Sequence, residues 1–347
     1  MVGRQQFFAG LLALVLAACG PEMTIWDAAD EARIGASEHA NIVEKYGGVY
    51  ENAALTAYVE RVMARVAAAS DKPDADYHIT LLDSPVVNAL ALPGGYNYVT
   101  RGFLALADSE AELAGVIGHE LGHITARHSA QRHTAAAMVG VLGLILDEVV
   151  DDDDRKRASK ILAVGSGLVL LRYSREHEYE ADNIGVHTLA RAGYAPIAKA
   201  RILHAIGAYG DLQGARGDDL PLIGDWLSTH PNSEARVARM RDVAAVMHLA
   251  ESTSGDDAFG GVSRGELGRD RYLDAIDGMA YGETEEGVSP RYVRVMRVQR
   301  GDTLDMLADW MEIDGTAQEK AALLRVLNGL EAGRSPEVGR RIKLIRR

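Results

Sequence analysis

Two histidines, His119 and His123, stand four residues apart, with Glu120 directly after the first. If this stretch is helical, residues i and i+4 share one face, so both imidazoles can bind one zinc ion. Such a site has three protein ligands and a water molecule that the metal acidifies enough to attack a peptide carbonyl. Glu120 can then act as the general base. The spacing therefore predicts a zinc hydrolase whose third protein ligand comes from elsewhere.

The flanking residues predict that this stretch is one long helix. Ser109 followed by Glu112 is typical of a capping box at a helix start. Apolar residues then recur at helical spacing, namely Leu113, Val116, Ile117, Leu121 and Ile124. We expect a second helix to supply the remaining ligand.

The best candidate for the second helix is the segment 173–182. Within it Glu178 and Asp182 are again four residues apart, so one can bind the metal while the other holds a ligand histidine through a hydrogen bond. Three ionisable neighbours point to other sides of the same helix: Glu176, His177 and Glu180. Spacing alone leaves open which carboxylate binds zinc.

Three ordered motifs carry a family resemblance. They are the His-Glu-Leu-Gly-His run at 119–123, the Glu-Tyr-Glu-Ala-Asp run at 178–182, and the segment 88–102 with its Leu-Pro-Gly-Gly. Together they resemble the zinc endopeptidases related to HtpX and the prenyl-protein proteases, in particular the soluble periplasmic branch typified by BepA and LoiP. The resemblance covers roughly residues 25–250. It implies Glu178 as the third zinc ligand and Asp182 as the supporting carboxylate.

Two short runs rich in β-branched and aromatic residues, 77–82 and 96–100, predict strands ahead of the zinc helix. Pro93-Gly94-Gly95 predicts the turn between strands. An edge strand beside a metal can pair with an extended peptide through main-chain hydrogen bonds. The resemblance implies this use, although a simple hairpin connection would give the same pattern.

A further motif, Thr229-His230-Pro231 followed by Arg236, has a counterpart in the relatives. The resemblance implies that His230 approaches zinc, either as an inhibitory fourth ligand or as a contact to the tetrahedral intermediate. Arg236 is a candidate for oxyanion stabilisation or for support of the site. The alternative is a proline-terminated turn with a surface histidine. The other histidines lack ligand spacing and are expected to face solvent: His39, His78, His128, His133, His187, His204 and His248.

The composition, with 47% hydrophobic and 25% charged residues among 347, predicts a globular chain of more than one domain. A net charge of -13 argues against nucleic acid as a partner. Two apolar runs, 135–146 and 161–171, are shorter than the about 20 residues that a spanning helix needs. With the charged segment 147–157 between them, they predict an apolar helical hairpin beside the active site, acting as a lid or as a membrane-touching element.

The only cysteine, Cys19, follows an apolar run at 7–18. Leu16-Ala17-Ala18-Cys19 resembles the bacterial lipobox, which predicts a signal peptide over 1–19 and a lipid on Cys19. Gly20 after the cysteine favours the outer membrane by resemblance to sorted lipoproteins. The alternative is a cleaved secretory signal without lipid. A single cysteine is compatible with an oxidising periplasm.

The C-terminal part differs in charge from the rest. Residues 291–347 carry 12 Lys and Arg against 8 Asp and Glu, which predicts a domain boundary near 290 after a linker rich in Ser, Gly and Asp at 251–268. Gly301-Asp302-Thr303-Leu304 and the closing run 339–345 resemble a LysM module, a βααβ fold that binds N-acetylglucosamine chains such as peptidoglycan. The alternative is a small packing or protein-docking domain.

The sequence thus predicts an α+β, mainly α fold: signal peptide (1–19), zinc metallopeptidase domain with a small sheet (25–250), linker and helical extension (251–290) and LysM-like module (291–347). We expect a lipid-anchored periplasmic endopeptidase with one Zn²⁺ on His119, His123 and Glu178, which cleaves misfolded or stalled envelope proteins. Two alternatives remain. One is a latent or chaperone-like protein in which His230 caps the zinc, and the other is a peptidoglycan-tethering protein that acts through its tail.

Overall fold

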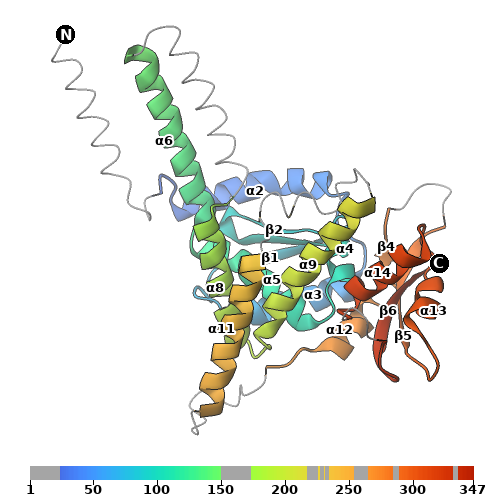
Figure 1. The fold of residues 1–347 in the computed structure, drawn as a ribbon. Coiled ribbons are helices and arrows are strands. Elements are labelled where there is room, and N and C mark those ends of the chain that lie inside the picture. The colour runs from blue at the N-terminus through green and yellow to red at the C-terminus, as the bar shows by residue number, and fades with distance from the viewer. Residues whose placement is uncertain are drawn as a thin grey trace.

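The computed structural model describes residues 24–149, 173–216, 226, 230, 234–253, 265–283, 289–330 and 335–347. The predictions on Cys19, on the signal peptide, on the apolar run 161–171 and on the residues flanking His230 lie outside the described residues. The other apolar run lies in helix α6, which projects from the body of the molecule (Figure 1). Within the described ranges, no helix has the length and apolar character needed to cross a membrane.

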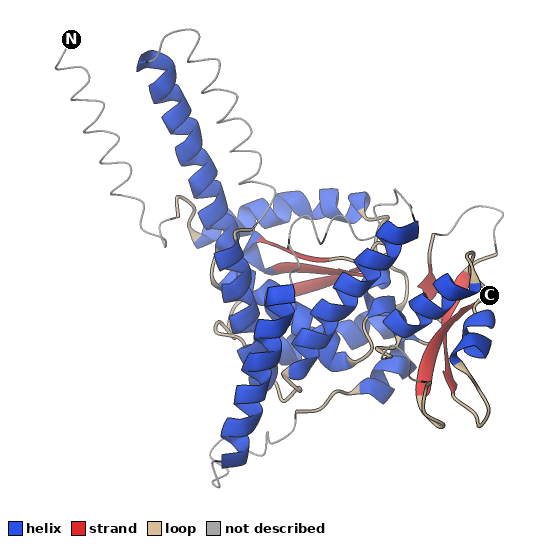
Figure 2. Cartoon of the chain, viewed as in Figure 1, coloured by secondary structure: helices blue, strands red, loops and turns tan. Residues whose placement is uncertain are grey.

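The main body (the described residues up to 253) consists of helices around one small sheet (Figure 2). Its helices are α2 (Ala28–Lys45), α3 (Ala53–Ala68), α4 (Arg101–Leu106), α5 (Glu110–Thr125), α6 (His128–Val149), α8 (Arg175–Arg191), α9 (Ile197–Arg216) and α11 (Glu234–Thr253). The mainly helical α+β fold is therefore confirmed.

The sheet of the main body has the strand order β1-β3-β2. The predicted strands correspond to β1 (His78–Leu82) and β3 (Tyr96–Thr100), which run parallel. The edge strand β2 (Ala89–Leu92) pairs antiparallel with β3, and a 3₁₀ turn at Pro93–Gly95 joins the two, as the glycines predict. This arrangement puts an edge strand next to the zinc helix α5, as the contacts between β2 and α5 show.

Helix α5 begins as predicted at Ser109, whose hydroxyl accepts a hydrogen bond from the backbone N–H of Glu112. The second half of the predicted capping box is wrong, because the Glu112 carboxylate accepts from the N–H of Asp108 (2.7 Å) instead. The helix packs closely on α8 where glycines meet. A Cβ on Gly185 would lie 3.0 Å from the backbone nitrogen of His119, and one on Gly122 would lie 2.9 Å from the carbonyl oxygen of Ala181. These glycines let α8 approach the two histidines.

The C-terminal module follows helix α12 (Arg269–Ile276) and contains β4 (Ala280–Tyr281), β5 (Arg291–Arg297), α13 (Leu304–Asp309), α14 (Ala317–Leu327) and β6 (Arg341–Arg346). Its strands form an antiparallel sheet in the order β4-β5-β6. The order strand, helix, helix, strand after residue 291 is the one that the LysM resemblance predicts, while β4 adds a strand before it. The resemblance itself stays a prediction.

The module packs directly on the main body, and its apolar side chains belong to the same buried cluster. Lys343 of β6 is fully buried, and its Nζ donates to the carbonyl oxygens of Ala105 (3.0 Å), Leu106 (3.2 Å) and Ala107 at the end of α4. Since these carbonyls end a helix, an ammonium group is a favourable partner for them.

Candidate active site

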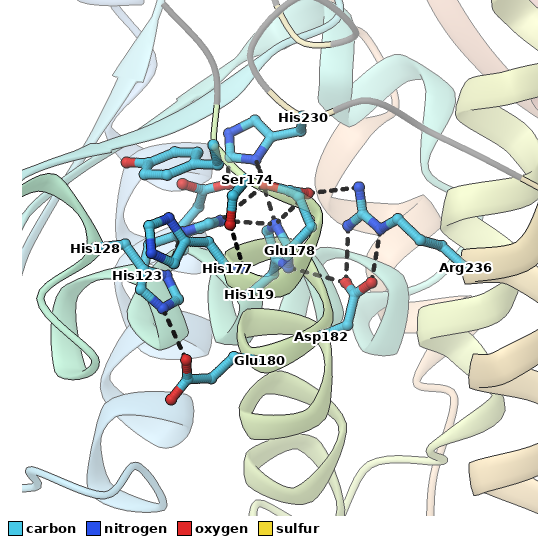
Figure 3. A network of polar contacts seen from close by, with 12 residues as sticks. His119, His123, His128, Ser174, His177, Glu178, Glu180, Asp182, His230 and Arg236 are labelled. Atoms are coloured by element: carbon cyan, nitrogen blue, oxygen red, sulfur yellow. Dashed lines mark hydrogen bonds and ion pairs between the residues drawn. The ribbon is translucent and has the colours of Figure 1, made fainter. Parts of the chain in front are cut away.

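Three donor atoms from two helices meet in the core of the main body (Figure 3). The Nε2 atoms of His119 and His123 lie 3.1 Å apart. Oxygens of Glu178, on α8, lie 3.6 Å from the first and 3.4 Å from the second. Zinc held by bonds of about 2.0–2.1 Å in a tetrahedron separates its ligand atoms by about 3.3 Å. The donor set and its spacing therefore fit one zinc ion.

His230 supplies a fourth donor to the same group. Its Nδ1 lies 2.9 Å from Oε1 of Glu178 and 3.4 Å from Nε2 of His119. The ring is buried and stacks on the indole of Trp226, whose carbonyl accepts the His230 N–H (2.7 Å). The alternative of a surface histidine in a turn is therefore wrong. All four donor atoms lie within 4.8 Å of one another.

Glu120 lies beside the donor group without belonging to it. Its side chain is buried, and Oε1 lies 3.9 Å from Nε2 of His230 and accepts no hydrogen bond from the part of the chain that the structure describes. Burial raises the pKa of Glu120 to about 7. A carboxyl group with a pKa near neutrality can both take up and release a proton at neutral pH.

Asp182, one turn after Glu178 on α8, supports His119 from behind. Its Oδ1 lies 2.9 Å from Nδ1 of His119, and its two oxygens accept a forked pair of bonds from Arg236 (2.7 and 2.9 Å). Although burial opposes ionisation, the charge of Lys199 and the hydrogen bonds from His119 and Arg236 hold the pKa of Asp182 well below its usual range. Arg236 also contacts Glu178 (2.5 Å). These contacts favour site support over oxyanion stabilisation as its role.

Lys199 is a site residue that the sequence analysis missed. It lies on α9, is fully buried, and holds its Nζ 3.1 Å from Oδ1 of Asp182. The sequence signal was a lysine among the apolar residues Ala198, Ala200 and Ile202, since a lysine needs an acidic partner if such a helix face is buried.

His128 is the second missed residue, and the prediction that it faces solvent is wrong. It is fully buried, and its Nδ1 lies 2.8 Å from Nδ1 of His123. The physical reason is a reversal at Arg127, whose φ of 59° ends α5 and returns the chain toward the site. Glu180 and His177, predicted to point elsewhere, contact His128 from its other sides.

The remaining histidines differ in how exposed their side chains are. Those that are exposed, as predicted, are His78, His187 and His204. His39 is half-buried and its Nδ1 lies 2.9 Å from the hydroxyl of Tyr98, while His133 is half-buried against Trp26. The side chain of His248 lies outside the described residues.

Two histidines from an HExxH helix, joined by a glutamate from a following helix, define a class of zinc metallopeptidases. The chain belongs to peptidase family M48, whose profile matches residues 53–244. The family resemblance read from the motifs is thereby confirmed, and residues 53–244 form a domain of the metallopeptidase type.

Curated relatives agree with this assignment. The mitochondrial metalloendopeptidase OMA1 of Arabidopsis thaliana is 38% identical over 171 residues, which cover 49% of this chain and 32% of that protein. The beta-barrel assembly-enhancing protease of Escherichia coli K12 is 27% identical over 262 residues, 72% of this chain and 52% of that protein. OMA1 of Schizosaccharomyces pombe is 29% identical over 226 residues, 65% of this chain and 64% of that protein. The chain thus spans about a third to two thirds of these relatives.

Proposed function

We propose that this chain is a periplasmic zinc endopeptidase that hydrolyses polypeptides of the cell envelope, with His119, His123 and Glu178 as zinc ligands. One observation carries the proposal. The Nε2 atoms of His119 and His123 lie 3.1 Å apart, and each lies 3.4–3.6 Å from an oxygen of Glu178. The buried Glu120 lies beside them.

In the proposed mechanism, bound zinc supplies an acidified water and a Lewis acid for the scissile carbonyl. Glu120 takes the proton of the attacking water on its carboxylate and later gives it to the leaving amine. Asp182 accepts the Nδ1–H of His119 and so keeps Nε2 of that ring free to bind a cation. Arg236 neutralises Glu178 and Asp182 together, which allows two carboxylates to share one buried site.

For the substrate we propose an extended peptide that adds to the edge strand β2. A small pocket beside this strand is lined by Ala91, Leu92, Gly94, His123 and Tyr173 among others, so it lies between the strand and a zinc ligand. Main-chain pairing with β2 would give affinity without strict side-chain selectivity. Such loose selectivity suits misfolded or stalled envelope proteins. The name of the Escherichia coli relative, beta-barrel assembly-enhancing protease, supports β-barrel proteins as the substrate class.

We further propose that the chain is latent with His230 in its present position, because a fourth protein donor excludes substrate from the metal. His230→Ala should then raise basal casein cleavage and self-cleavage at unchanged zinc content. A fall in turnover would instead make His230 a contact to the transition state.

The remaining sequence predictions stand as proposals: lipid at Cys19, an outer-membrane anchor, and a LysM-like module at 291–347 that binds peptidoglycan. Palmitate labelling that Cys19→Ala abolishes would support the anchor. Retention of the full chain on peptidoglycan would support the module.

The test of the enzyme is casein digestion with a chelator control, combined with metal analysis. Glu120→Gln should keep about one zinc per chain and lower hydrolysis by about 10²–10⁴-fold, as expected for loss of a general base. Glu178→Ala should lose zinc and activity together, while Glu176→Ala, at an exposed position of the same helix, should retain both. Full zinc retention by Glu178→Ala would refute the ligand assignment.

A further inference from the structure

The ring of His123 has both nitrogens engaged. Its Nε2 lies 3.1 Å from Nε2 of His119 and 3.4 Å from Glu178, which directs it into the donor group. Its Nδ1 lies 2.8 Å from Nδ1 of His128, and one face of the ring stacks on Tyr173 with centroids 3.9 Å apart. His128 in turn holds its Nε2 3.2 Å from Oε2 of Glu180.

Only one arrangement of protons satisfies this chain of contacts when Nε2 of His123 binds a cation. A metal-binding ring nitrogen carries no hydrogen, so the hydrogen of neutral His123 must be on Nδ1. Nδ1 of His128 must then accept it, which leaves the hydrogen of neutral His128 on Nε2. The carboxylate of Glu180 accepts that hydrogen. Each hydrogen bond is therefore donated away from the metal, from His123 to His128 and from His128 to Glu180.

On this basis we infer that His128 and Glu180 are positioning residues, which hold His123 in the tautomer and orientation that bind zinc. The inference rests on the proposed zinc site. His128 then contacts Nδ1 of His123 in the way that Asp182 contacts Nδ1 of His119. Partners of this kind are expected to raise the basicity of a ligand histidine and to fix its ring.

The surroundings suit His128 to this role. Its ring is fully buried and stacks on His177 with centroids 4.3 Å apart, so its own orientation is fixed. Glu180 belongs to α8, between Glu178 and Asp182. Helix α8 thus provides one ligand and, directly or through His128, the hydrogen-bond acceptors behind both ligand histidines.

The test compares two substitutions at one position in the full chain. His128→Asn keeps a hydrogen-bond acceptor near the place of Nδ1, whereas His128→Leu fills the space without one. Zinc affinity, measured by competition with a chromophoric chelator, should fall about 10–100-fold in His128→Leu, the usual effect of losing such a partner. It should be largely restored in His128→Asn.

Equal zinc affinity of His128→Leu and wild type would overturn the inference, as would equally weak binding by both variants, because a packing role makes no distinction by acceptor. If His128→Leu does not fold, Glu180→Ala provides the second test, since the side chain of Glu180 is 57% exposed. It should weaken zinc binding and shift the visible absorption of the cobalt-substituted protein, and unchanged values would refute the inference. Two other outcomes would refute the proposed zinc site itself: wild type that does not bind zinc, or Glu178→Ala that binds zinc normally.

Discussion

At the scale of residues, the site is a cluster of buried charges that balance one another. Glu178 and Asp182 face Arg236, and Lys199 adds a second cation on Asp182. Removing one partner of a buried pair costs about 3–5 kcal/mol, because the other charge is left unpaired. Glu120 is less well compensated, because its Oε1 accepts no hydrogen bond from the described residues and lies 3.9 Å from Nε2 of His230.

This isolation of Glu120 leads to a prediction about proton release. Burial raises its pKa to about 7, so at pH 6.5 the carboxyl group is mostly protonated before zinc binds. A nearby dication favours the ionised form and lowers this pKa. Zinc uptake should therefore release protons at pH 6.5, and zinc affinity should rise with pH through about 7. Calorimetry in buffers of different ionisation enthalpy measures the number released.

The control is Glu120→Gln, which has the same shape but no proton to lose. It should release fewer protons per zinc than wild type at pH 6.5. An identical count in both proteins would show that Glu120 is already ionised in the metal-free chain.

At the scale of elements, the zinc site is a crossing of two helices. Helix geometry predicts from the sequence that His119 and His123 share one face and that Glu178 and Asp182 share another. The choice of Glu178 as the proposed ligand comes from the family resemblance. The contacts of His128 and Lys199 could not be predicted from the sequence. They depend on the left-handed turn at Arg127 and on how α9 packs against α5, and local spacing encodes neither.

The closeness of the crossing can be tested at Gly185. A methyl group there would meet the backbone of α5, with the nitrogen of His119 at 3.0 Å. Gly185→Ala should therefore push α8 away from α5, lower the free energy of unfolding by about 1–3 kcal/mol and weaken zinc binding. Denaturant unfolding of the metal-free chain and chelator competition measure the two effects.

Gly214→Ala is the matched control, because it lies in α9 and no atom of the described residues lies within 4 Å of the added Cβ. An exposed helical Gly→Ala change is neutral or slightly stabilising. If both variants keep wild-type stability and zinc affinity, the glycine contact does not set the distance between ligands.

At the scale of the whole molecule, the C-terminal module is joined to the segment that leads into the zinc helix. Asp108, directly before Ser109, accepts a forked pair of bonds from Arg269 of α12 (both 2.8 Å), and Arg340 approaches it to 3.7 Å. Lys343 binds the carbonyls just before Asp108. The module and helix α12 thus contact the segment that starts α5 directly.

Lys343→Met tests this connection. The variant leaves the carbonyls of Ala105 and Leu106 without their ammonium donor, which should lower the free energy of unfolding by about 1–3 kcal/mol. Lys72→Met, at an exposed position, should change stability little.

The stability difference between wild type and Lys343→Met should also depend on pH. Burial lowers the pKa of Lys343 to about 8, below the about 10.4 of an unfolded lysine, so between these values the unfolded state binds more protons. The stability of wild type relative to Lys343→Met should therefore increase as pH rises from about 8 to about 10. Chemical denaturation of both proteins across this range measures it. A difference that stays constant would show that burial does not lower the pKa of Lys343, and one that shrinks would show that its contacts raise this pKa.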